Sequence, residues 1–247
     1  MALTLRDLTF GYWRGRLVLD GLDLTVDAPA TVLLGPNGAG KSTLLALAAS
    51  HLTPTRGRVS WHGRTPSGRR QRAAYRTAVA WLPQQITPVP GLTVREQVAY
   101  AGWLKGMSRA AAWRASAGCL ARVGLSELAG RRSHQLSGGQ LRRMGIAGAL
   151  THRSELILLD EPTAGLDPTQ RKVFRALLGE LAGEVQVLVS THQTEDIADL
   201  YDQVVVLDRG TVRFQGTTAD FHALAGAAAG PREQAEAAYA RLVGGEV

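Results

Sequence analysis

The chain has little cysteine and no long apolar run, and both absences narrow its class. Its 247 residues include one cysteine, Cys119, so no disulfide can form within the chain, as is typical of a protein from a reducing compartment. No apolar stretch reaches the roughly 20 residues that a bilayer-spanning helix needs. The first residues lack a basic segment followed by an apolar one, so they predict no secretory signal. We therefore expect a cytoplasmic protein that does not cross a membrane.

Lysine is also scarce, so the net charge of +7 comes largely from arginine. The lysines are Lys41, Lys105 and Lys172. The basic clusters Arg69-Arg70-Gln71-Arg72 and Arg131-Arg132 contain no interleaved aromatic residues of the kind that stack on bases. An Arg- and Ala-rich composition also follows from a GC-rich genome, and contact with nucleic acid or an anionic membrane surface is the alternative explanation of the charge. We expect no nucleic-acid partner.

The sequence predicts mainly β-strands in the first third of the chain. Alternating or continuous apolar residues predict strands at Leu3–Phe10, Leu17–Val26, Ala30–Leu34, Arg58–Trp61 and Thr77–Leu82. A helix is expected at Ser42–His51, and a basic loop containing Gly and Pro is expected at Gly63–Arg72.

The middle of the chain has a helical pattern from Thr93 to Leu150, which predicts a helical lobe at about 88–150 inserted between strand-rich parts. It begins with the capping box Thr93-Val94-Arg95-Glu96, and Ser108 is expected to cap a second helix. Beyond Glu155, strands and helices alternate, which predicts a mainly parallel sheet with crossover helices. They are expected at Leu156–Leu159, Pro168–Leu181, Val185–Ser190, Thr194–Tyr201 and Val204–Leu207. A short helix is expected after Pro231, within a tail of residues 225–247.

A glycine-rich segment that follows the apolar run ending at Leu34 fits the P-loop pattern for nucleoside triphosphates. Its glycines turn backbone N–H groups toward one point, where they surround phosphate oxygens. The pattern assigns Lys41 to the β- and γ-phosphates and the Ser42 hydroxyl to Mg²⁺. The candidate phosphate-binding residues are Gly35, Pro36, Asn37, Gly38, Ala39, Gly40, Lys41, Ser42 and Thr43.

Two acidic residues, Asp160 and Glu161, end the apolar run that begins at Leu156. A buried strand delivers such residues to the carboxyl edge of a sheet, where α/β proteins bind ligands. Asp160 is therefore a candidate ligand of Mg²⁺, and Glu161 is a candidate group to orient or deprotonate the water that attacks the γ-phosphate.

The segment Leu136-Ser137-Gly138-Gly139-Gln140 has the spacing of a capping box between Ser137 and Gln140. Capping does not explain the two glycines, because glycine in a helical turn costs about 1 kcal/mol relative to alanine. The glycines therefore predict a helix start that another group approaches closely, and a phosphate is the natural candidate at a helix N-terminus.

With these motifs in order, nearly the whole chain resembles the ATP-binding subunit of an ATP-binding cassette (ABC) transporter. The resemblance implies an α/β fold with a P-loop NTPase (RecA-like) core, an N-terminal antiparallel β subdomain and an inserted helical subdomain, within residues 1–224. It implies adenine stacking on Tyr12, a Gln-loop role for Gln84 toward catalysis and Mg²⁺, and a γ-phosphate role for His192. It also implies that Asp167 lies near the nucleotide, and that Ser137, Gly138, Gly139 and Gln140 contact ATP. Trp13 and Gln85 are the alternatives to Tyr12 and Gln84, and Asp167 also reads as the cap of a helix that starts at Pro168.

The resemblance further implies its partners. Two nucleotide-binding domains, identical or different, dimerise head to tail around two ATP, and separate transmembrane permease subunits bind them at the cytoplasmic face of the membrane. The Leu104-Lys105-Gly106 segment and the C-terminal part resemble subunits of ABC-2 exporters, so export is expected. An importer subunit and a soluble ABC ATPase are the alternatives. A P-loop kinase or GTPase is disfavoured by the Leu136–Gln140 motif and by the lack of a guanine-reading Asn-Lys-x-Asp.

Overall fold

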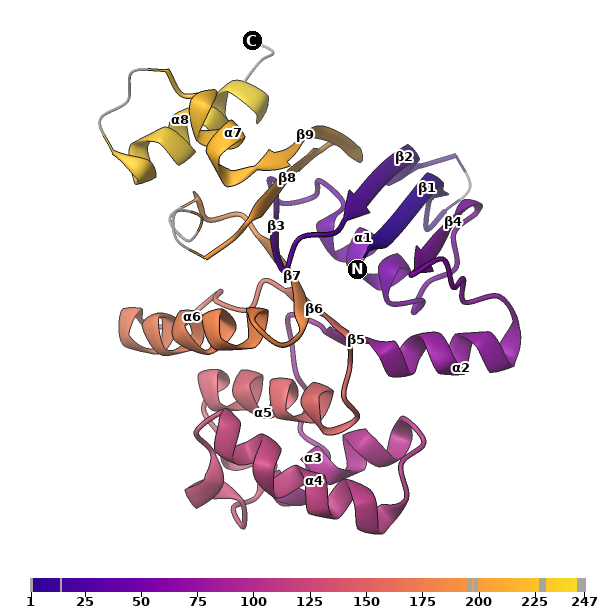
Figure 1. Ribbon diagram of the computed structural model, residues 1–247, viewed down its shortest axis with the longest axis vertical. Helices are drawn as coiled ribbons and strands as arrows, with labels where there is room; N and C mark the ends of the chain where they lie inside the picture. Colours follow the sequence, from indigo (N-terminus) through magenta and orange to yellow (C-terminus); the bar gives the residue numbers. More distant parts are fainter. Residues whose placement is uncertain (1, 14, 195–196, 198–199, 227–229, 244–247) are drawn as a thin grey trace.

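The computed structural model describes residues 2–13, 15–194, 197, 200–226 and 230–243. It contains a three-stranded antiparallel sheet and a six-stranded sheet, with helices on both faces of the larger one (Figure 1). The strands are β1 (Leu3–Phe10), β2 (Leu19–Val26), β3 (Ala30–Leu34), β4 (Arg56–Trp61), β5 (Val79–Leu82), β6 (Leu156–Asp160), β7 (Gln186–Thr191), β8 (Gln203–Asp208) and β9 (Thr211–Thr217). The helices are α1 (Lys41–Ala48), α2 (Gly68–Ala78), α3 (Val94–Leu104), α4 (Arg109–Arg122), α5 (Gly138–Thr151), α6 (Pro168–Ala182), α7 (Thr218–Ala223) and α8 (Pro231–Val243), with 3-10 turns η1 (Ser126–Leu128) and η2 (Ser133–Gln135).

The larger sheet has the order β5-β6-β7-β3-β8-β9, and its first five strands run parallel. β3, β6 and β7 are buried along their whole length, as expected for strands covered on both faces. Their register pairs Leu34 with Thr191, and Asp160 with Ser190. The carboxyl ends of these strands therefore meet at one edge of the sheet.

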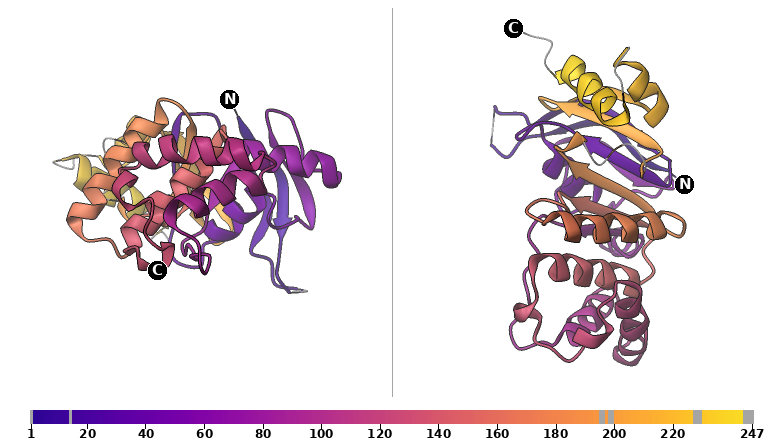
Figure 2. Two further views of the ribbon diagram at one scale, coloured as in Figure 1. Left: turned by 90° about the horizontal axis from the view of Figure 1, so that it is seen from below. Right: turned by 90° about the vertical axis from the view of Figure 1, so that its left-hand side faces the viewer.

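Alternate residues of the strands pack into two different cores. One core joins the sheet to α1 and to the small sheet β2-β1-β4, and the other joins it to α5, α6 and the helical region. Figure 1 and the right-hand view of Figure 2 show α1 and α6 on different sides of the strands. Strand residues of the α1 core include Leu33, Leu158 and Leu188, and those of the α5–α6 core include Val32, Ile157 and Val187.

The helical region follows the sequence prediction closely. Thr93 and Glu96 form the expected capping box of α3, and the Ser108 hydroxyl accepts a hydrogen bond from the Ala111 N–H at the start of α4. Asp167 caps α6 with proline at its first position, also as predicted. Local hydrogen bonds of this kind depend on neighbouring residues only, which explains why the sequence locates these helix starts.

The basic loop predicted at Gly63–Arg72 is wrong in its second half, because α2 begins at Gly68 and extends into the predicted strand at Thr77. Arginine and alanine favour helix, and the tertiary structure anchors this one. The Tyr75 hydroxyl donates to the carbonyl oxygen of Ala48 at 2.6 Å, and the Arg76 guanidinium bonds Ser50. These anchors lie far along the chain from α2, so no local pattern indicated them.

The elements of the C-terminal part agree only partly with the sequence prediction. The predicted helix after Pro231 is confirmed as α8, whose Ala235 and Ala238 are buried. β9 and α7 were not predicted, since β9 is an edge strand with a half-exposed pattern. Half of the segment predicted at Thr194–Tyr201 lies outside the residues that the structure describes.

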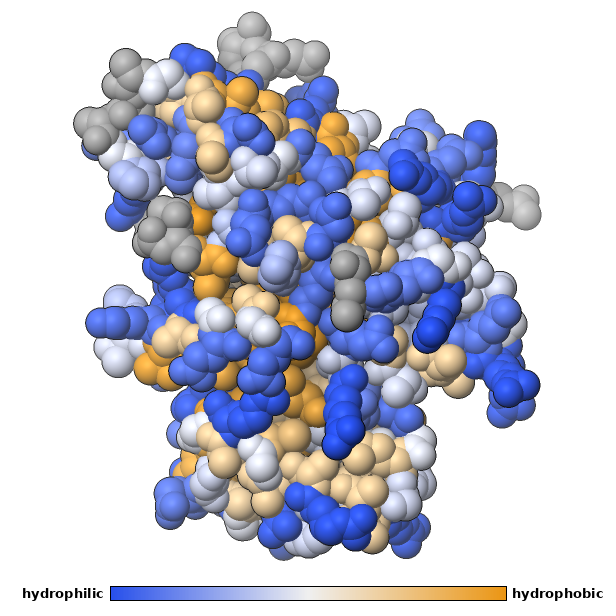
Figure 3. Space-filling model, viewed as in Figure 1, coloured by the Kyte–Doolittle hydropathy of each residue, from blue (hydrophilic) through white to orange (hydrophobic). Residues whose placement is uncertain are grey.

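Hydrophilic and apolar side chains mix over the face that Figure 3 shows. None of the helices in the described part of the chain is long and apolar enough to cross a membrane.

The buried His152 lies where α5 ends, between the sheet and the helical region, and is 8% exposed. Its Nδ1 is 3.3 Å from the carbonyl oxygen of Gly148, whereas its Nε2 has no hydrogen-bond partner. Burial, followed by the charge of Lys105, lowers the pKa of His152 from 6.5 to about 4.

This shift predicts a pH-dependent stability. Because His152 binds a proton more tightly in the unfolded chain, its stabilising effect is complete above pH 6.5 and is lost as the pH falls toward 4. The loss is up to about 3 kcal/mol. Urea unfolding across this range should give a shallower pH dependence for His152→Gln than for the wild type, while the exposed His134→Gln should match the wild type. Equal slopes for all three proteins would contradict the assignment.

Candidate functional site

The glycine-rich segment from Gly35 to Gly40 connects β3 to α1 at the carboxyl edge of the large sheet. Gly38 and Gly40 have φ values of 85° and 103°, in the region that disfavours other residues. A Cβ on Gly35 would lie 2.2 Å from the carbonyl oxygen of Leu207, so the neighbouring strand also requires glycine. No side chain caps the start of α1. Its first N–H groups are therefore available to an anion.

Lys41 folds back over this loop and is 6% exposed. Its ammonium donates hydrogen bonds to the carbonyl oxygens of Gly35 at 2.7 Å and Pro36 at 3.2 Å. It also lies 3.4 Å from Oε1 of Glu161. The lysine thus joins the loop after β3 to the residue after β6.

Asp160 and Glu161 occupy the end of β6, and both are buried. The Ser190 hydroxyl donates to Oδ1 of Asp160 at 2.6 Å, and the Glu161 N–H donates to Oγ of Ser190 at 3.0 Å. Glu161 has a φ of 45°, which is strained for a residue with a side chain. Its Oε1 has no hydrogen-bond partner, although the Lys41 ammonium is close. Glu161 is therefore a buried carboxylate that has an unusual backbone conformation and one oxygen without a hydrogen-bond donor.

His192, one residue after β7, brings a third charged or polar group to the same point. Its Nδ1 lies 2.9 Å from Oε2 of Glu161, and its side chain is 42% exposed. Glu161 and His192 thus directly follow β6 and β7, whereas Lys41 starts α1 after the loop that follows β3, and the three contact one another in a row. The sequence predicted each of these residues for the site, and the parallel register brings them together.

Tyr12 and Gln84 stand at the periphery of this group. The Tyr12 hydroxyl is 3.2 Å from Oγ1 of Thr43, which places the ring beside the start of α1. Its ring also packs edge-on against Phe10, whereas Trp13 is 80% exposed. Gln84 is exposed on the loop after β5, at the same sheet edge, and no contact joins it to the other site residues that the structure describes. The structure therefore ties Tyr12, but not Gln84, to the glycine-rich loop.

The residues Ser137, Gly138, Gly139 and Gln140 start α5, away from Lys41 and Glu161. Ser137 and Gln140 form the predicted capping box. A Cβ on Gly139 would lie 2.6 Å from Oε1 of Gln170, so a side chain of α6 explains this glycine. Nothing lies within 4 Å of a Cβ on Gly138. The phosphate that the sequence suggested for both glycines is thus needed, at most, for Gly138.

Comparison with known proteins identifies the family. A model of the ABC transporter family matches residues 19–164, which is more than half of the chain. The chain belongs to the ABC transporter family. As a member of it, this cassette is an ATP-binding ATPase, and the resemblance predicted from its motifs is confirmed.

Two relatives show how far the similarity extends. The phosphonates import ATP-binding protein PhnC of Thiobacillus denitrificans is 37% identical over an alignment of 240 residues, and the match covers 91% of this chain and 90% of the relative. The cobalt import ATP-binding protein CbiO of Rhodobacter capsulatus is 39% identical over 216 residues, which are 86% of this chain and 77% of the relative.

Solved ABC cassettes have the same fold. CbiO1 from Clostridium perfringens, part of the transporter complex CbiONQ, matches with a TM-score of 0.78 and 28% identity over 90% of each chain. The dimeric cassette MJ0796 matches with a TM-score of 0.77 and 27% identity, over 87% of this chain and 98% of the other. The predicted fold class, with its antiparallel N-terminal sheet and mainly parallel core, is therefore confirmed.

Two residues connect the site motifs of this ABC cassette, although the sequence did not single them out. Ser190 contacts both acidic residues, and its position two residues before His192 was the only signal for it. Arg142, on α5, donates to the carbonyl oxygen of Ala164 at 2.6 Å. Arg142 thereby joins the helix that begins at Ser137 to the loop between β6 and α6.

The contact of Arg142 predicts a measurable loss. Arg142→Ala leaves the Ala164 carbonyl without its donor, so the unfolding free energy should fall by about 1–3 kcal/mol. The ATPase rate should fall too, with ATP affinity kept, because the contact does not touch the glycine-rich loop. Urea unfolding and steady-state kinetics measure both, with Arg114→Ala as a control on an exposed arginine. If both variants match the wild type, the contact has no role.

Proposed function

We propose that this cassette hydrolyses ATP at the edge formed by β3, β6 and β7, and that it drives transport through separate membrane subunits. The observation that carries the proposal is the row of Lys41, Glu161 and His192, with the unbonded Oε1 of Glu161 in its middle. A strained, buried carboxylate beside a phosphate-binding loop is suited to act on water next to the γ-phosphate.

The residues present fit ATP and Mg²⁺. The uncapped start of α1 and the loop from Gly35 to Thr43 suit the phosphates, and Tyr12 offers an exposed ring for the adenine. Ser42 and Asp160, with Gln84, would hold Mg²⁺, which supplies positive charge to the phosphate oxygens. Within the described residues, no three His, Cys, Asp or Glu side chains gather into a metal site. A small number of protein ligands is compatible with Mg²⁺, because protein sites often bind this ion through one or two carboxylates together with substrate phosphates.

Each charged group has a task that follows from its contacts. Lys41 exchanges its bonds to the loop carbonyls for phosphate oxygens, which releases Glu161 from the ion pair. Glu161 then orients or deprotonates the attacking water, and His192 keeps Glu161 in position and reaches toward the γ-phosphate. Asp167 caps α6 and keeps the loop after Glu161 in place.

A second cassette completes the site. The Ser137–Gln140 segment belongs to the α5–α6 side of the sheet, whereas α1 belongs to the other side, so one chain does not bring its own segment to its own phosphates. The open position at Gly138 leaves this helix start accessible to a phosphate held by a partner. The dimeric structure of the related cassette MJ0796 supports a dimer, in which the two chains would lie head to tail around two ATP.

The membrane partner and the direction of transport are further parts of the proposal. A peripheral position at the cytoplasmic face, bound to permease subunits, is supported by relatives that are ATP-binding proteins of transport systems. The sequence predicts export, but no relative named here supports it. Import is the second candidate direction, and it is favoured by the functions of PhnC and CbiO.

The role of Glu161 is tested by Glu161→Gln. This change keeps the shape and removes the base, so ATPase turnover should fall about 10²–10⁴-fold. ATP affinity should be equal or higher, because Lys41 loses its competing carboxylate. Turnover and nucleotide titration measure the two effects, and the exposed Glu180→Gln is the control. Near-normal turnover in Glu161→Gln would exclude Glu161 as the base.

The composite site is tested by mixing two inactive chains. Lys41→Ala disables the phosphate loop and Ser137→Arg blocks the helix start, so each mixed dimer retains one intact site. Some ATPase activity should return on mixing, and none should return when either variant is mixed with itself. If no activity returns, and Glu161→Gln stays monomeric with ATP, the homodimer model is wrong.

A further inference from the structure

The positive charge of this chain is concentrated in one segment. Residues 28–126 contain thirteen Lys or Arg and a single acidic residue, Glu96, whereas the rest of the chain contains fifteen Lys or Arg and twenty acidic residues. The net charge of the whole chain therefore arises from this segment alone. Apart from β3, α1, β4 and β5, the elements of the segment are α2, α3 and α4.

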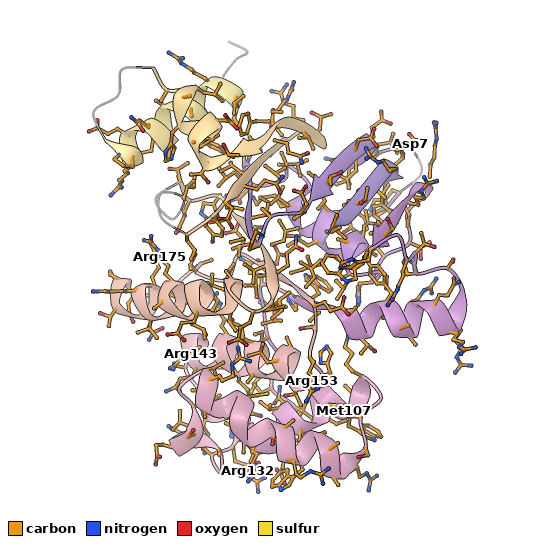
Figure 4. All side chains as sticks on the ribbon, viewed as in Figure 1. Asp7, Met107, Arg132, Arg143, Arg153 and Arg175 are labelled. Carbon is orange, nitrogen blue, oxygen red and sulfur yellow. The ribbon has the colours of Figure 1, made fainter. Side chains whose placement is uncertain are left out.

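α3 and α4 pack against each other at one end of the molecule, and the C-terminal end of α2 meets the segment just after α3 (Figure 1). The Lys105 ammonium, just after α3, donates to the carbonyl oxygen of Arg76 in α2 at 2.5 Å. The Thr77 hydroxyl of α2 also lies 3.5 Å from the carbonyl oxygen of Lys105. The left-hand view of Figure 2 shows α2 beside the helices of this end, and Figure 4 shows Arg132 close to α4.

Among the residues that the structure describes, most of the arginines on α2 and α4 have no hydrogen-bond or ion-pair partner. None of five such arginines forms a hydrogen bond or ion pair with the residues that the structure describes. Apart from Arg72, which is half-buried, they are exposed. They are Arg69, Arg70, Arg72, Arg109 and Arg114.

Aromatic side chains stand beside one of these arginines, Arg109. Tyr100 and Trp103 of α3 and Trp113 of α4 are 38%, 43% and 43% exposed, and they line a groove of about 580 Å³ between the helices. The rings of Tyr100 and Trp103 stack on each other, and the Arg95 guanidinium lies 4.0 Å above the Trp113 ring. Large rings held in place yet left half-exposed indicate a surface that another phase or molecule covers.

We propose that α2, α3 and α4 form a surface that binds the anionic phospholipid headgroups of a membrane. Basic residues spread over neighbouring helices attract such a surface, and tryptophan and tyrosine favour the boundary between headgroups and acyl chains. The proposal draws on the proposed membrane role of the cassette. It requires neither ATP hydrolysis nor a permease, so its failure and the failure of the ATPase proposal are distinguishable.

The chemistry of the groove favours lipid over an acidic peptide. Glu96 lines the groove, and hydrogen bonds from Thr93 lower its pKa, so it stays charged. An acidic segment seated in the groove would meet this like charge, whereas a headgroup layer contacts the arginines around it. Nucleic acid is disfavoured because Tyr100 and Trp103 cover one face of each other's rings.

The test is sedimentation of the full chain with vesicles of phosphatidylcholine, with or without phosphatidylglycerol, and without nucleotide. The chain should bind the anionic vesicles only, and raised salt should release it. Arg69→Gln with Arg70→Gln should weaken binding about 30-fold, at about 1 kcal/mol for each charge. The matched control is Arg153→Gln with Lys172→Gln, which removes two exposed charges outside the segment and should leave binding unchanged; Figure 4 labels Arg153.

A second variant separates the aromatic contribution. Tyr100→Ser with Trp103→Ser should weaken vesicle binding while keeping its salt dependence, and circular dichroism would verify folding. The proposal is overturned if wild-type protein does not prefer anionic vesicles at low salt, or if the control loses as much binding as Arg69→Gln with Arg70→Gln. It is also overturned if DNA binds more tightly than vesicles at equal salt, or if binding requires permease in the vesicles.

Discussion

The parallel register of β6, β7 and β3 is the constraint on which the rest of the site depends. Because Leu34 pairs with Thr191 and Asp160 pairs with Ser190, three strands end together and their next residues share one edge. Lys41, Glu161 and His192 come from distant parts of the chain, yet their side chains meet there. A shift of register in any of these strands would separate the phosphate loop from the acidic residue. The buried strands make such a shift costly, since it would move apolar side chains between the two cores.

The buried charges of Lys41 and Glu161 at this edge balance each other. Lys41 is almost fully buried and bonds the carbonyl oxygens of its own loop, and Glu161 supplies the nearest negative charge. A buried charge without a partner is costly, so this pairing stabilises the position of both side chains. The hydrogen bond to Ser190 and the surrounding core hold the Glu161 backbone in its strained conformation, which keeps the carboxylate near the loop.

The two faces of the large sheet bear different parts of the nucleotide site. The α1 face bears the phosphate loop, and the α5–α6 face bears the Ser137 segment. Arg142 links α5 to the loop after Glu161, and Gln170 of α6 packs against Gly139. A site that needs both groups therefore needs two chains. The charge is divided as well, since the basic surface formed by α2, α3 and α4 lies within a segment that holds one acidic residue. Nucleotide chemistry, dimerisation and contact with a membrane would thus use different parts of one cassette.

The sequence by itself determined the local features of this protein, and the tertiary structure decided those that depend on distant neighbours. The glycines before Lys41, the caps at Thr93, Ser137 and Asp167, and the acidic end of β6 were readable because each involves residues within a few positions of one another. The helix α2 was not, because Tyr75 and Arg76 are anchored to Ala48 and Ser50. The sequence predicts that Gly139 allows the close approach of a phosphate, but in the fold the side chain of Gln170 lies where a Cβ on Gly139 would point. The contact of Glu161 with both Lys41 and His192, and the separation of the Ser137 segment from its own phosphate loop, follow from strand order and register, which a linear pattern does not encode.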